Sequence, residues 1–348
     1  MSIVTIKLTD VKSQTSERPE KCPYCEGEIF QSWGQARKMI RDQKVKEVDV
    51  RRYRCCRCHK TFRHYPQGVD RKSQSQRLRK VAGIMWMLGL SYRSLEIVLD
   101  FFGVKLSRMS GWRDVQERAG QLSREQKGKR VRVLGLDVGY FRGMGATQSV
   151  MVAVDMGDGR PITIGYVDEK DPQAVKRFLQ PLVQQMGVSV VVTDDLATYR
   201  KVTGQLDLEH QVCQFHLRRW VGRTLRELRQ TVPEEWRGVV EEIQQIIDEL
   251  PIHGERRLFQ LWKQIPESRQ GRMDEPYTPL DQLRYLIIRL AENWRRYRVF
   301  DWDKEVPWTN NLTEQTIGRM KMRSRTVRGY KSKRGMLNAL LLVGMGLC

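Results

Sequence analysis

The sequence has no long hydrophobic run. Its longest apolar stretch, residues 339–348, is far shorter than the roughly 20 residues that a membrane-spanning helix needs. Residues 1–20 also lack the apolar core of a secretory signal peptide. These two absences argue against a membrane protein and against a secreted one, and we expect a soluble protein of the cytoplasm.

Acidic residues are few for the number of basic ones. The 348 residues include 41 Asp and Glu against 62 Lys and Arg, which gives a formal net charge of +21. The basic excess lies at both ends of the chain, while the middle is nearly neutral. Solvated basic faces are one explanation, but an excess of this size favours segments that bind a polyanion such as DNA. A DNA-binding protein would be associated with the nucleoid.

Cysteine is scarce, and most of its 7 residues lie between positions 22 and 58. An odd number argues against a disulfide framework. Two Cys-x-x-Cys pairs can close a tetrahedral zinc site: Cys22, Cys25, Cys55 and Cys58. We predict a zinc ribbon over residues 1–70, in which Cys56 is a spare thiol and His59 or His64 is an alternative ligand. A redox-active pair and unrelated cysteines are the other interpretations.

Residues 71–120 show the apolar spacing of three short helices separated by small residues. Ser91 is the expected N-cap of the second helix, and the third is expected at residues 107–119. The third helix carries basic and aromatic side chains suited to DNA: Arg108, Trp112 and Arg113. We predict a helix-turn-helix unit whose last helix enters the major groove, with a three-helix linker bundle as the alternative. The charged residues 121–130 are expected to form a linker.

The next segment combines strand and helix patterns. Apolar runs predict strands at residues 131–138, 147–155, 161–167 and 188–193, with a helix at residues 171–186. Three strands, a helix and a strand form the order of a ribonuclease H-like α/β core, in which the first and fourth strands are parallel neighbours. We therefore expect the ends of these two strands to lie side by side.

Acidic residues occur on both of these strands. Asp137 lies in the apolar first strand, where an unpaired carboxylate is costly, and Asp194 and Asp195 follow the fourth strand. Neighbouring carboxylates repel each other unless a cation holds them, and hard divalent metals take oxygen ligands. Asp155 lies in a Gly-containing turn and is explained as a turn residue, which is the alternative interpretation for the other acids.

Glu314 is the only acidic residue from Val306 to the C-terminus. It lies near the start of a predicted helix that Thr309 or an Asn would cap, and Lys321 falls on the same helical face. A metal-binding carboxylate beside a lysine that contacts phosphate suits phosphodiester chemistry, whereas an i,i+4 salt bridge is the alternative. The same segment supplies arginines expected to contact DNA: Arg319, Arg323, Arg325 and Arg328.

A helical and acidic segment, residues 217–305, separates two parts of the predicted core, residues 131–216 and 306–348. Apolar residues recur in it at helical spacing, so we expect an all-helical insertion. Trp262 and Trp294 are candidates to stack on a displaced base, although packing in the core of the insertion is the alternative.

The three acids Asp137, Asp194 and Glu314 resemble the Asp-Asp-Glu triad of insertion-sequence transposases. Motifs around the triad extend the similarity: Thr193-Asp194-Asp195 followed by Tyr199, Thr309-Asn310-Asn311 before Glu314, Lys321 after it, and then Arg328-Gly329-Tyr330-Lys331-Ser332. The pattern Cys213-x-x-His216 is similar to a feature of Mutator-like transposases, and we interpret it as a wall of the active site. Many such enzymes also have an N-terminal zinc ribbon and helix-turn-helix. The similarity covers essentially the entire chain.

The resemblance implies a DNA transposase that works by two-metal phosphoryl transfer. The triad would hold Mg²⁺ or Mn²⁺, two ions per active site, with Asp137 bridging both ions. Supporting roles fall to Asp195, His216 and Lys321. Asp195 is also the alternative to Asp194 as the second acid, since both carboxylates could reach a metal. The enzyme would cut double-stranded DNA at the terminal inverted repeats and join the freed 3′-hydroxyl ends to target DNA, as a homodimer or larger assembly. A metal-dependent, structure-specific nuclease and a zinc-ribbon transcriptional regulator without catalysis are the alternatives.

Overall fold

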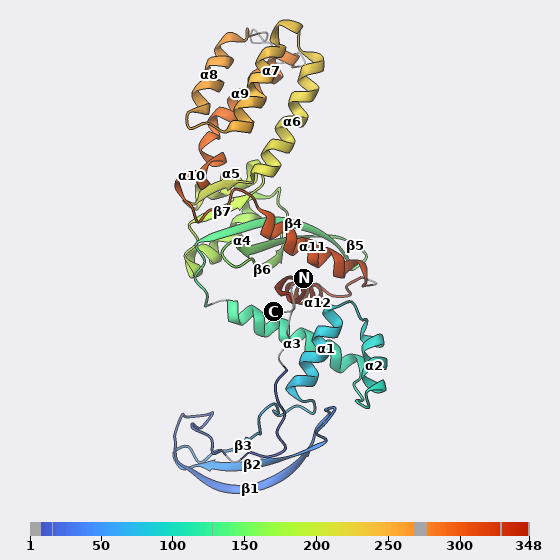
Figure 1. The fold of residues 1–348 in the computed structure, drawn as a ribbon. Helices are drawn as coiled ribbons and strands as arrows, with labels where there is room; N and C mark the ends of the chain where they lie inside the picture. The colour runs from blue at the N-terminus through green and yellow to red at the C-terminus, as the bar shows by residue number, and fades with distance from the viewer. Residues whose placement is uncertain (1–7, 16, 127, 268–276, 328, 347–348) are drawn as a thin grey trace. The chain divides into compact units, whose positions relative to one another are not determined.

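The computed structural model describes residues 8–15, 17–126, 128–267, 277–327 and 329–346 of the chain (Figure 1). Contacts divide the chain into two compact units. The first contains residues 1–124, 142–145 and 319–348, and the second contains residues 125–141 and 146–318. None of the helices in the described ranges has the length and hydropathy that a bilayer span requires.

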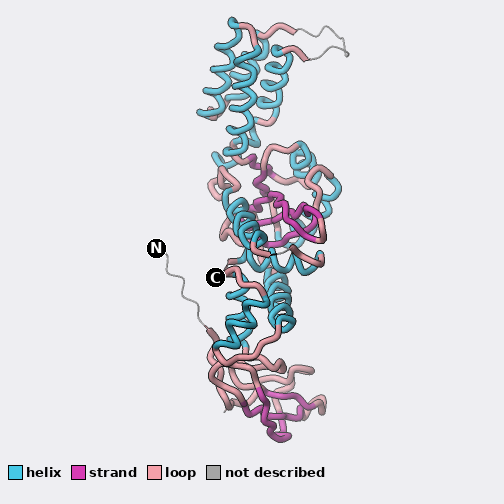
Figure 2. The backbone as a smooth tube through the Cα atoms, turned by 90° about the vertical axis from the view of Figure 1, so that its right-hand side faces the viewer, coloured by secondary structure: helices cyan, strands magenta, loops and turns pink. Residues whose placement is uncertain are grey.

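A three-stranded antiparallel sheet forms the N-terminal part of the first unit, and its strands are drawn in magenta in Figure 2. The strands are β1 (Phe30–Met39), β2 (Glu47–Cys55) and β3 (Thr61–His64), in the order β1-β2-β3. Two small apolar clusters pack on this sheet. Tyr53 and Phe62 lie in the cluster beside the cysteines, and Val48 and Val50 lie in the other. The cysteine pairs therefore lie at one end of a small sheet with little apolar core of its own.

Three helices follow the sheet: α1 (Gln76–Met87), α2 (Tyr92–Phe101) and α3 (Arg108–Gln126). The N-cap predicted at Ser91 is confirmed, because its side chain accepts a hydrogen bond from the backbone N–H of Ser94. The linker predicted at residues 121–130 is wrong over its first half, where α3 continues. Leu122 is buried and extends the apolar face of α3, although most of its neighbours are polar.

Two helices lie near the C-terminus, α11 (Asn311–Arg325) and α12 (Lys333–Met345). The side chain of Asn338 on α12 donates a hydrogen bond of 2.8 Å to Gln116 on α3. Residues 319–348 accordingly cluster with the first unit and not with the catalytic core expected at residues 306–348. The apolar sequence of α12 predicts that the helix is buried, but it does not indicate in which of the two units.

A five-stranded sheet forms the centre of the second unit. Its strands are β4 (Val133–Gly143), β5 (Ala146–Asp155), β6 (Pro161–Tyr166), β7 (Val190–Thr193) and β8 (Glu209–Val212). The strand order is β6-β5-β4-β7-β8, in which β7 is parallel to both β4 and β8 and β5 is antiparallel to β6. Helices α4 (Pro172–Met186) and α5 (Ala197–Gln205) connect the last three strands. This is the topology predicted for a ribonuclease H-like core.

Helices of the second unit fill the segment expected to be an insertion. They are α6 (Gln214–Thr231), η1 (Glu234–Trp236), α7 (Arg237–Glu249), α8 (Gly254–Gln264), α9 (Pro279–Glu292), η2 (Trp294–Tyr297) and α10 (Val299–Trp302). Helices α6 to α9 run side by side around one apolar core (Figure 1). Trp294 is buried in that core and Trp262 packs against it. The interpretation of Trp294 as a base-stacking residue is therefore wrong, because its ring faces the protein interior.

Candidate active site

The start of α11 lies directly against β4. The side chain of Asn310, which precedes the helix, donates a hydrogen bond of 2.8 Å to the carbonyl oxygen of Leu136. A Cβ atom at Gly135 would collide with the Asn310 side chain, so glycine is required for this close approach. As a result Glu314, in the first turn of α11, is held next to the strand that carries Asp137.

Asp137 and Asp194 lie opposite each other at the centre of the sheet. Residues 133–135 of β4 pair in parallel with residues 190–192 of β7, which confirms the predicted pairing of the first and fourth strands. Continuing this register along both strands sets Asp137 opposite Asp194. Neighbouring strands are about 4.8 Å apart, so the two carboxyl groups leave the sheet as close neighbours.

The surroundings of both carboxyl groups disfavour their charged forms. Burial raises the pKa of Asp137 to about 6, and the negative charge of Glu314 adds to this effect. Burial likewise raises the pKa of Asp194 to about 7, with a further contribution from the charge of Asp137. Oδ1 of Asp194 is also buried without a hydrogen-bond partner among the described residues. A bound cation would relieve both the repulsion and the missing contact.

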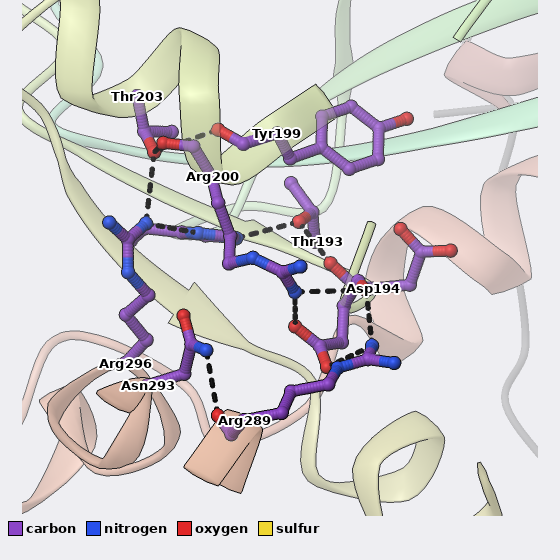
Figure 3. A network of polar contacts seen from close by, with 10 residues as sticks. Thr193, Asp194, Tyr199, Arg200, Thr203, Arg289, Asn293 and Arg296 are labelled. Atoms are coloured by element: carbon purple, nitrogen blue, oxygen red, sulfur yellow. Dashed lines mark hydrogen bonds and ion pairs between the residues drawn. The ribbon is translucent and has the colours of Figure 1, made fainter. Parts of the chain in front are cut away.

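Asp195 is already paired with two arginines. Its carboxylate accepts hydrogen bonds from Arg200 of α5 and from Arg289 of α9, the second at 2.8 Å, and its side chain is almost completely buried. Figure 3 shows the two guanidinium groups converging beside Asp194. In the part of the chain that the structure describes, no lysine or arginine pairs with the Asp194 carboxylate. Of the two candidates for the second acid, this geometry favours Asp194.

A buried histidine supports the end of β7. Nδ1 of His210 lies 3.1 Å from Arg296, which can only donate, so Nδ1 accepts and Nε2 carries the proton. Nε2 lies 2.8 Å from the hydroxyl oxygen of Thr193, the residue before Asp194 (Figure 3). Burial, together with the charges of Arg296 and Arg200, lowers the pKa of His210 to about 3. The network therefore requires the neutral imidazole.

Acidification is expected to destabilise the second unit through His210. Its folded pKa lies below the unfolded value of about 6.5, so stability is present above pH 6.5 and is lost as the pH falls towards 3. One such group changes the free energy of unfolding by at most about 1.4 kcal/mol per pH unit. Urea unfolding is measured at about pH 7 and about pH 4.5. The free energy of unfolding should fall less between these two pH values for His210→Gln than for the wild type. Equal losses would contradict the assignment.

Cys213 and His216 lie beside Glu314. His216 is in the first turn of α6, and its Nε2 lies 2.9 Å from Oε1 of Glu314. Sγ of Cys213 accepts a hydrogen bond of 3.3 Å from the backbone N–H of Asn310, just before α11. One ligand-type atom from each of Cys213, His216 and Glu314 lies within 4.8 Å of the others. The Cys-x-x-His pattern thus forms a wall next to the third acid, and His216 orients its carboxylate.

One acidic residue near the site was not predicted from the sequence. Glu169 lies on the loop after β6 and accepts a hydrogen bond of 2.9 Å from the hydroxyl of Tyr140. Its charge contributes to the raised pKa of both Asp137 and Asp194. Acidic loop residues are common, and no local pattern distinguishes Glu169 from the adjacent Asp168.

Asp155 is confirmed as a turn residue. Its Oδ1 accepts a hydrogen bond of 2.8 Å from the backbone N–H of Gly157. Lys129 pairs with the same carboxylate through its other oxygen. Both oxygens of the Asp155 carboxylate therefore have partners nearby, which makes Asp155 a suitable control for the candidate catalytic acids.

The four predicted zinc ligands come together beside the N-terminal sheet. The sulfur atoms of Cys22 and Cys58 lie 3.7 Å apart, those of Cys25 and Cys55 lie 3.6 Å apart, and all four lie within 4.8 Å of one another. Thiolates about 2.3 Å from a tetrahedral zinc ion would be about 3.8 Å apart, so the arrangement fits zinc. The group consists of cysteines alone, and it leaves Cys56 as the spare thiol.

The arginines predicted to contact DNA differ in exposure. Arg323 is buried, stacks 4.4 Å from the ring centroid of Trp86 and donates a hydrogen bond to the carbonyl of Leu90. Its prediction as a DNA contact is wrong, because its guanidinium is used inside the first unit. Arg319 similarly donates a hydrogen bond of 3.0 Å to the carbonyl of Gly344.

The remaining candidates for DNA contact lie at the surface of the first unit. Arg108 is exposed but forms a 2.7 Å ion pair with Glu96. The other exposed candidates are Trp112, Arg113, Lys321 and Arg325. Arg328 lies outside the described residues.

The sequence is similar to a transposase family and to a protein of an insertion element. The family model described as Transposase IS66 family matches residues 150–338. The uncharacterized 48.3 kDa protein of insertion element ISM1 from Methanobrevibacter smithii is 22% identical over 337 residues, which are 92% of this chain and 80% of that protein.

Two solved structures are also similar at low identity. The Drosophila P element transposase strand transfer complex has a TM-score of 0.41 and 10% identity over 76% of this chain and 91% of the matched chain. The catalytic core domain of BIV integrase has a TM-score of 0.21 and 15% identity over 47% of this chain and 96% of the matched one. Because the family model spans more than half of the sequence, the chain belongs to the IS66 family of transposases, which are DDE transposases of insertion elements.

Proposed function

We propose that this transposase cuts DNA at the ends of its insertion element and joins the freed 3′-hydroxyl groups to target DNA, using one site formed by Asp137, Asp194 and Glu314. The main support for the proposal is the parallel strand register of β4 and β7, whose continuation sets the half-buried carboxyl groups of Asp137 and Asp194 opposite each other. The contact between α11 and β4 supplies the third acid at the same place.

The donor set of this site fits hard divalent cations. Its three acids offer carboxylate oxygens, which Mg²⁺ and Mn²⁺ prefer as ligands, and Oδ1 of Asp194 has no other partner among the described residues. Asp137, Asp194 and Glu314 would hold these ions, two for each site. When bound, the ions would activate the attacking water or 3′-hydroxyl and stabilise the leaving oxygen.

Other side chains position these acids. His216 fixes the carboxylate of Glu314 through their 2.9 Å contact. Asp195 anchors the end of β7 through its two arginines and so limits the movement of Asp194. Lys321, exposed on α11, is assigned to contact a DNA phosphate.

The four-cysteine cluster is assigned as a structural zinc site in a ribbon. We expect the purified protein to contain about one zinc ion per chain, since four thiolates complete the tetrahedral shell. The double variant Cys22→Ser/Cys25→Ser should lose the ion and unfold the ribbon, because its own apolar clusters are small. Metal analysis by mass spectrometry measures the loss directly. Cys56→Ser is the matched control, and zinc loss from Cys56→Ser equal to that of the double variant would contradict the assignment.

The first unit is assigned to binding double-stranded DNA. Its exposed basic and aromatic residues on α3, Trp112 and Arg113, suit a recognition helix, while the basic ribbon suits phosphate contacts. The sequences recognised would be the terminal inverted repeats of the insertion element. Joining two such ends requires at least two active sites, so we expect a homodimer or a larger assembly on DNA.

One experiment distinguishes the transposase from a metal-dependent nuclease with the same core. Purified protein is incubated with Mg²⁺ and duplex DNA that carries the end of the insertion element, and nicked, hairpin and joined products are separated on a gel. Products in which 3′ ends are covalently joined to target DNA support the proposal. Hydrolysis without joining would favour the nuclease, and the absence of Mg²⁺-dependent products would favour a regulator.

A further inference from the structure

A cavity of about 1060 Å³ opens beside the proposed catalytic acids in the second unit. Asp194 and His216 line its end at the active site. Its long sides come from α6 and α9, so it extends from the ribonuclease H-like sheet along the helical insertion. We call this cavity the α6–α9 groove.

One side of the groove carries a row of arginines on α6, Arg219, Arg223 and Arg226. They are spaced at successive helical turns, so they lie in a line of roughly 10 Å that begins next to His216. All three are exposed, and in the described part of the chain no carboxylate pairs with any of them. Unpaired cations aligned along a groove create a site for a chain of negative charges.

Other arginines of α6 have partners outside the groove. Arg229 forms a 2.7 Å ion pair with Glu241 of α7, and Arg218 donates a hydrogen bond of 3.1 Å to the carbonyl of Asp248. On the groove side, Arg226 donates a hydrogen bond of 3.2 Å to the carbonyl of Gly222 in its own helix. Among the described residues, Arg219 and Arg223 therefore carry the positive charge of the groove that is free of partners.

Aromatic rings line both sides of the groove. Tyr285 of α9 is 66% exposed and lines the groove together with Gln282, one turn earlier on the same helix. Trp220 of α6 also lines the groove, with the guanidinium of Arg289 positioned 4.2 Å from its ring centroid. Exposed aromatic faces can stack on nucleic-acid bases only where those bases are unpaired, because a duplex keeps base faces inside the stack.

We propose that the α6–α9 groove binds a single strand of DNA next to the cleaved phosphate, with the arginine row on its backbone and Tyr285 stacked on an unpaired base. The proposal rests on the proposed function, since it names the part of the DNA substrate that lies beside the active site. A basic wall that follows the backbone and an aromatic wall that stacks the bases are the two elements that single-strand sites combine.

Photo-crosslinking locates the strand. The full-length protein is mixed, without Mg²⁺, with duplex DNA carrying the end of the insertion element, in which 5-iodouracil replaces single thymines on either side of the cleavage position. Mass spectrometry of the irradiated complex should find the label on Tyr285 for positions within a few nucleotides of that site. Labels confined to residues outside the groove would overturn the proposal.

Affinity measurements test the arginine row. Fluorescence anisotropy is compared for two substrates, one with unpaired and one with paired nucleotides beyond the cleavage position. Arg219→Gln/Arg223→Gln should weaken binding of the unpaired substrate by roughly tenfold, since several charged contacts are lost, and that of the paired one much less. Arg218→Gln/Arg229→Gln removes the same charge from the other side of α6 and should leave the difference between the substrates unchanged.

The outcomes separate the two proposals. Equal weakening on both substrates, or equal effects of the two double variants, would overturn single-strand binding in the groove. The cleavage rate of the wild type is measured on the same DNA. If the wild type cleaves and joins DNA, but Arg219→Gln/Arg223→Gln binds both substrates as tightly as the wild type does, single-strand binding in the groove is disproved and the proposed function stands. If the wild type produces neither cleaved nor joined DNA, the proposed function fails, and the crosslink alone decides the inference.

Discussion

Asp137→Asn, Asp194→Asn and Glu314→Gln should each reduce DNA cleavage by roughly 10³-fold or more, while binding of the same DNA changes little. Each substitution keeps the size of the side chain but removes one negative charge from a site that we assign to two divalent cations. Losing several kcal/mol of transition-state stabilisation corresponds to a change of this size, because about 1.4 kcal/mol is tenfold in rate. Single-turnover cleavage in Mg²⁺ and anisotropy on the uncleaved DNA measure the two quantities.

Thermal unfolding supplies a second readout for the same variants. Burial and mutual repulsion raise the pKa of Asp194 to about 7, so its charged form, present above that pH, destabilises the folded chain. Without divalent metal at about pH 8, Asp194→Asn should therefore unfold at a higher temperature than the wild type. Asp155→Asn, which breaks a local turn, should remain active and should not be stabilised. Near-normal cleavage by Glu314→Gln would disprove the assignment of the triad.

Asp195→Asn should destabilise the protein, whereas Asp194→Asn should stabilise it, although the two residues are adjacent. It removes one partner from two buried ion pairs and leaves the guanidinium groups of Arg200 and Arg289 without their counter-charge. Breaking a buried pair in this way costs about 3–5 kcal/mol, so the second unit should be clearly destabilised at pH values where Asp194→Asn is stabilised. Urea unfolding of the two variants side by side measures the difference.

Arg289 of the helical insertion is expected to stabilise the end of β7 in the core through its ion pair with Asp195. Arg289→Gln should destabilise the protein and lower the cleavage rate, because α9 then no longer holds Asp195 and the end of β7. The matched control is Arg295→Gln, which breaks an exposed pair with Glu209 and should change stability by less than about 1 kcal/mol. If Asp195→Asn is as stable as the wild type but inactive, Asp195 is itself a metal ligand and our choice of Asp194 is wrong.

Local patterns in the sequence predicted the elements that carry the site. Apolar runs and one amphipathic helix were sufficient to predict four of the five strands and their ribonuclease H-like order. In that topology the first and fourth strands are neighbours, which implied that Asp137 and Asp194 lie close together. The cysteine pairs were similarly predictable, since spacing within each pair is a local property. A capping serine at position 91 was recognised because its hydrogen bond is made within one helical turn.

The features that the sequence did not predict depend on contacts between distant segments. Arg323 lies on a basic helix that looked suited to DNA, yet its guanidinium is buried against Trp86, more than two hundred positions away in the chain. The partner of Asp195 on α9 and the role of Glu169 beside the acids are equally non-local. The groove could not be found either, because its arginines alone are explained equally well as a solvated helix face.

The joining of pre-cleaved DNA shows whether one set of three acids performs both cleavage and strand transfer. Duplex DNA that already ends in the free 3′-hydroxyl of the insertion element is supplied with target DNA and Mg²⁺, and joined products are quantified for the wild type and for Glu314→Gln. We expect efficient joining by the wild type, and a loss of joining for Glu314→Gln as large as its loss of cleavage. Normal joining by a Glu314→Gln variant that cannot cleave would contradict this expectation.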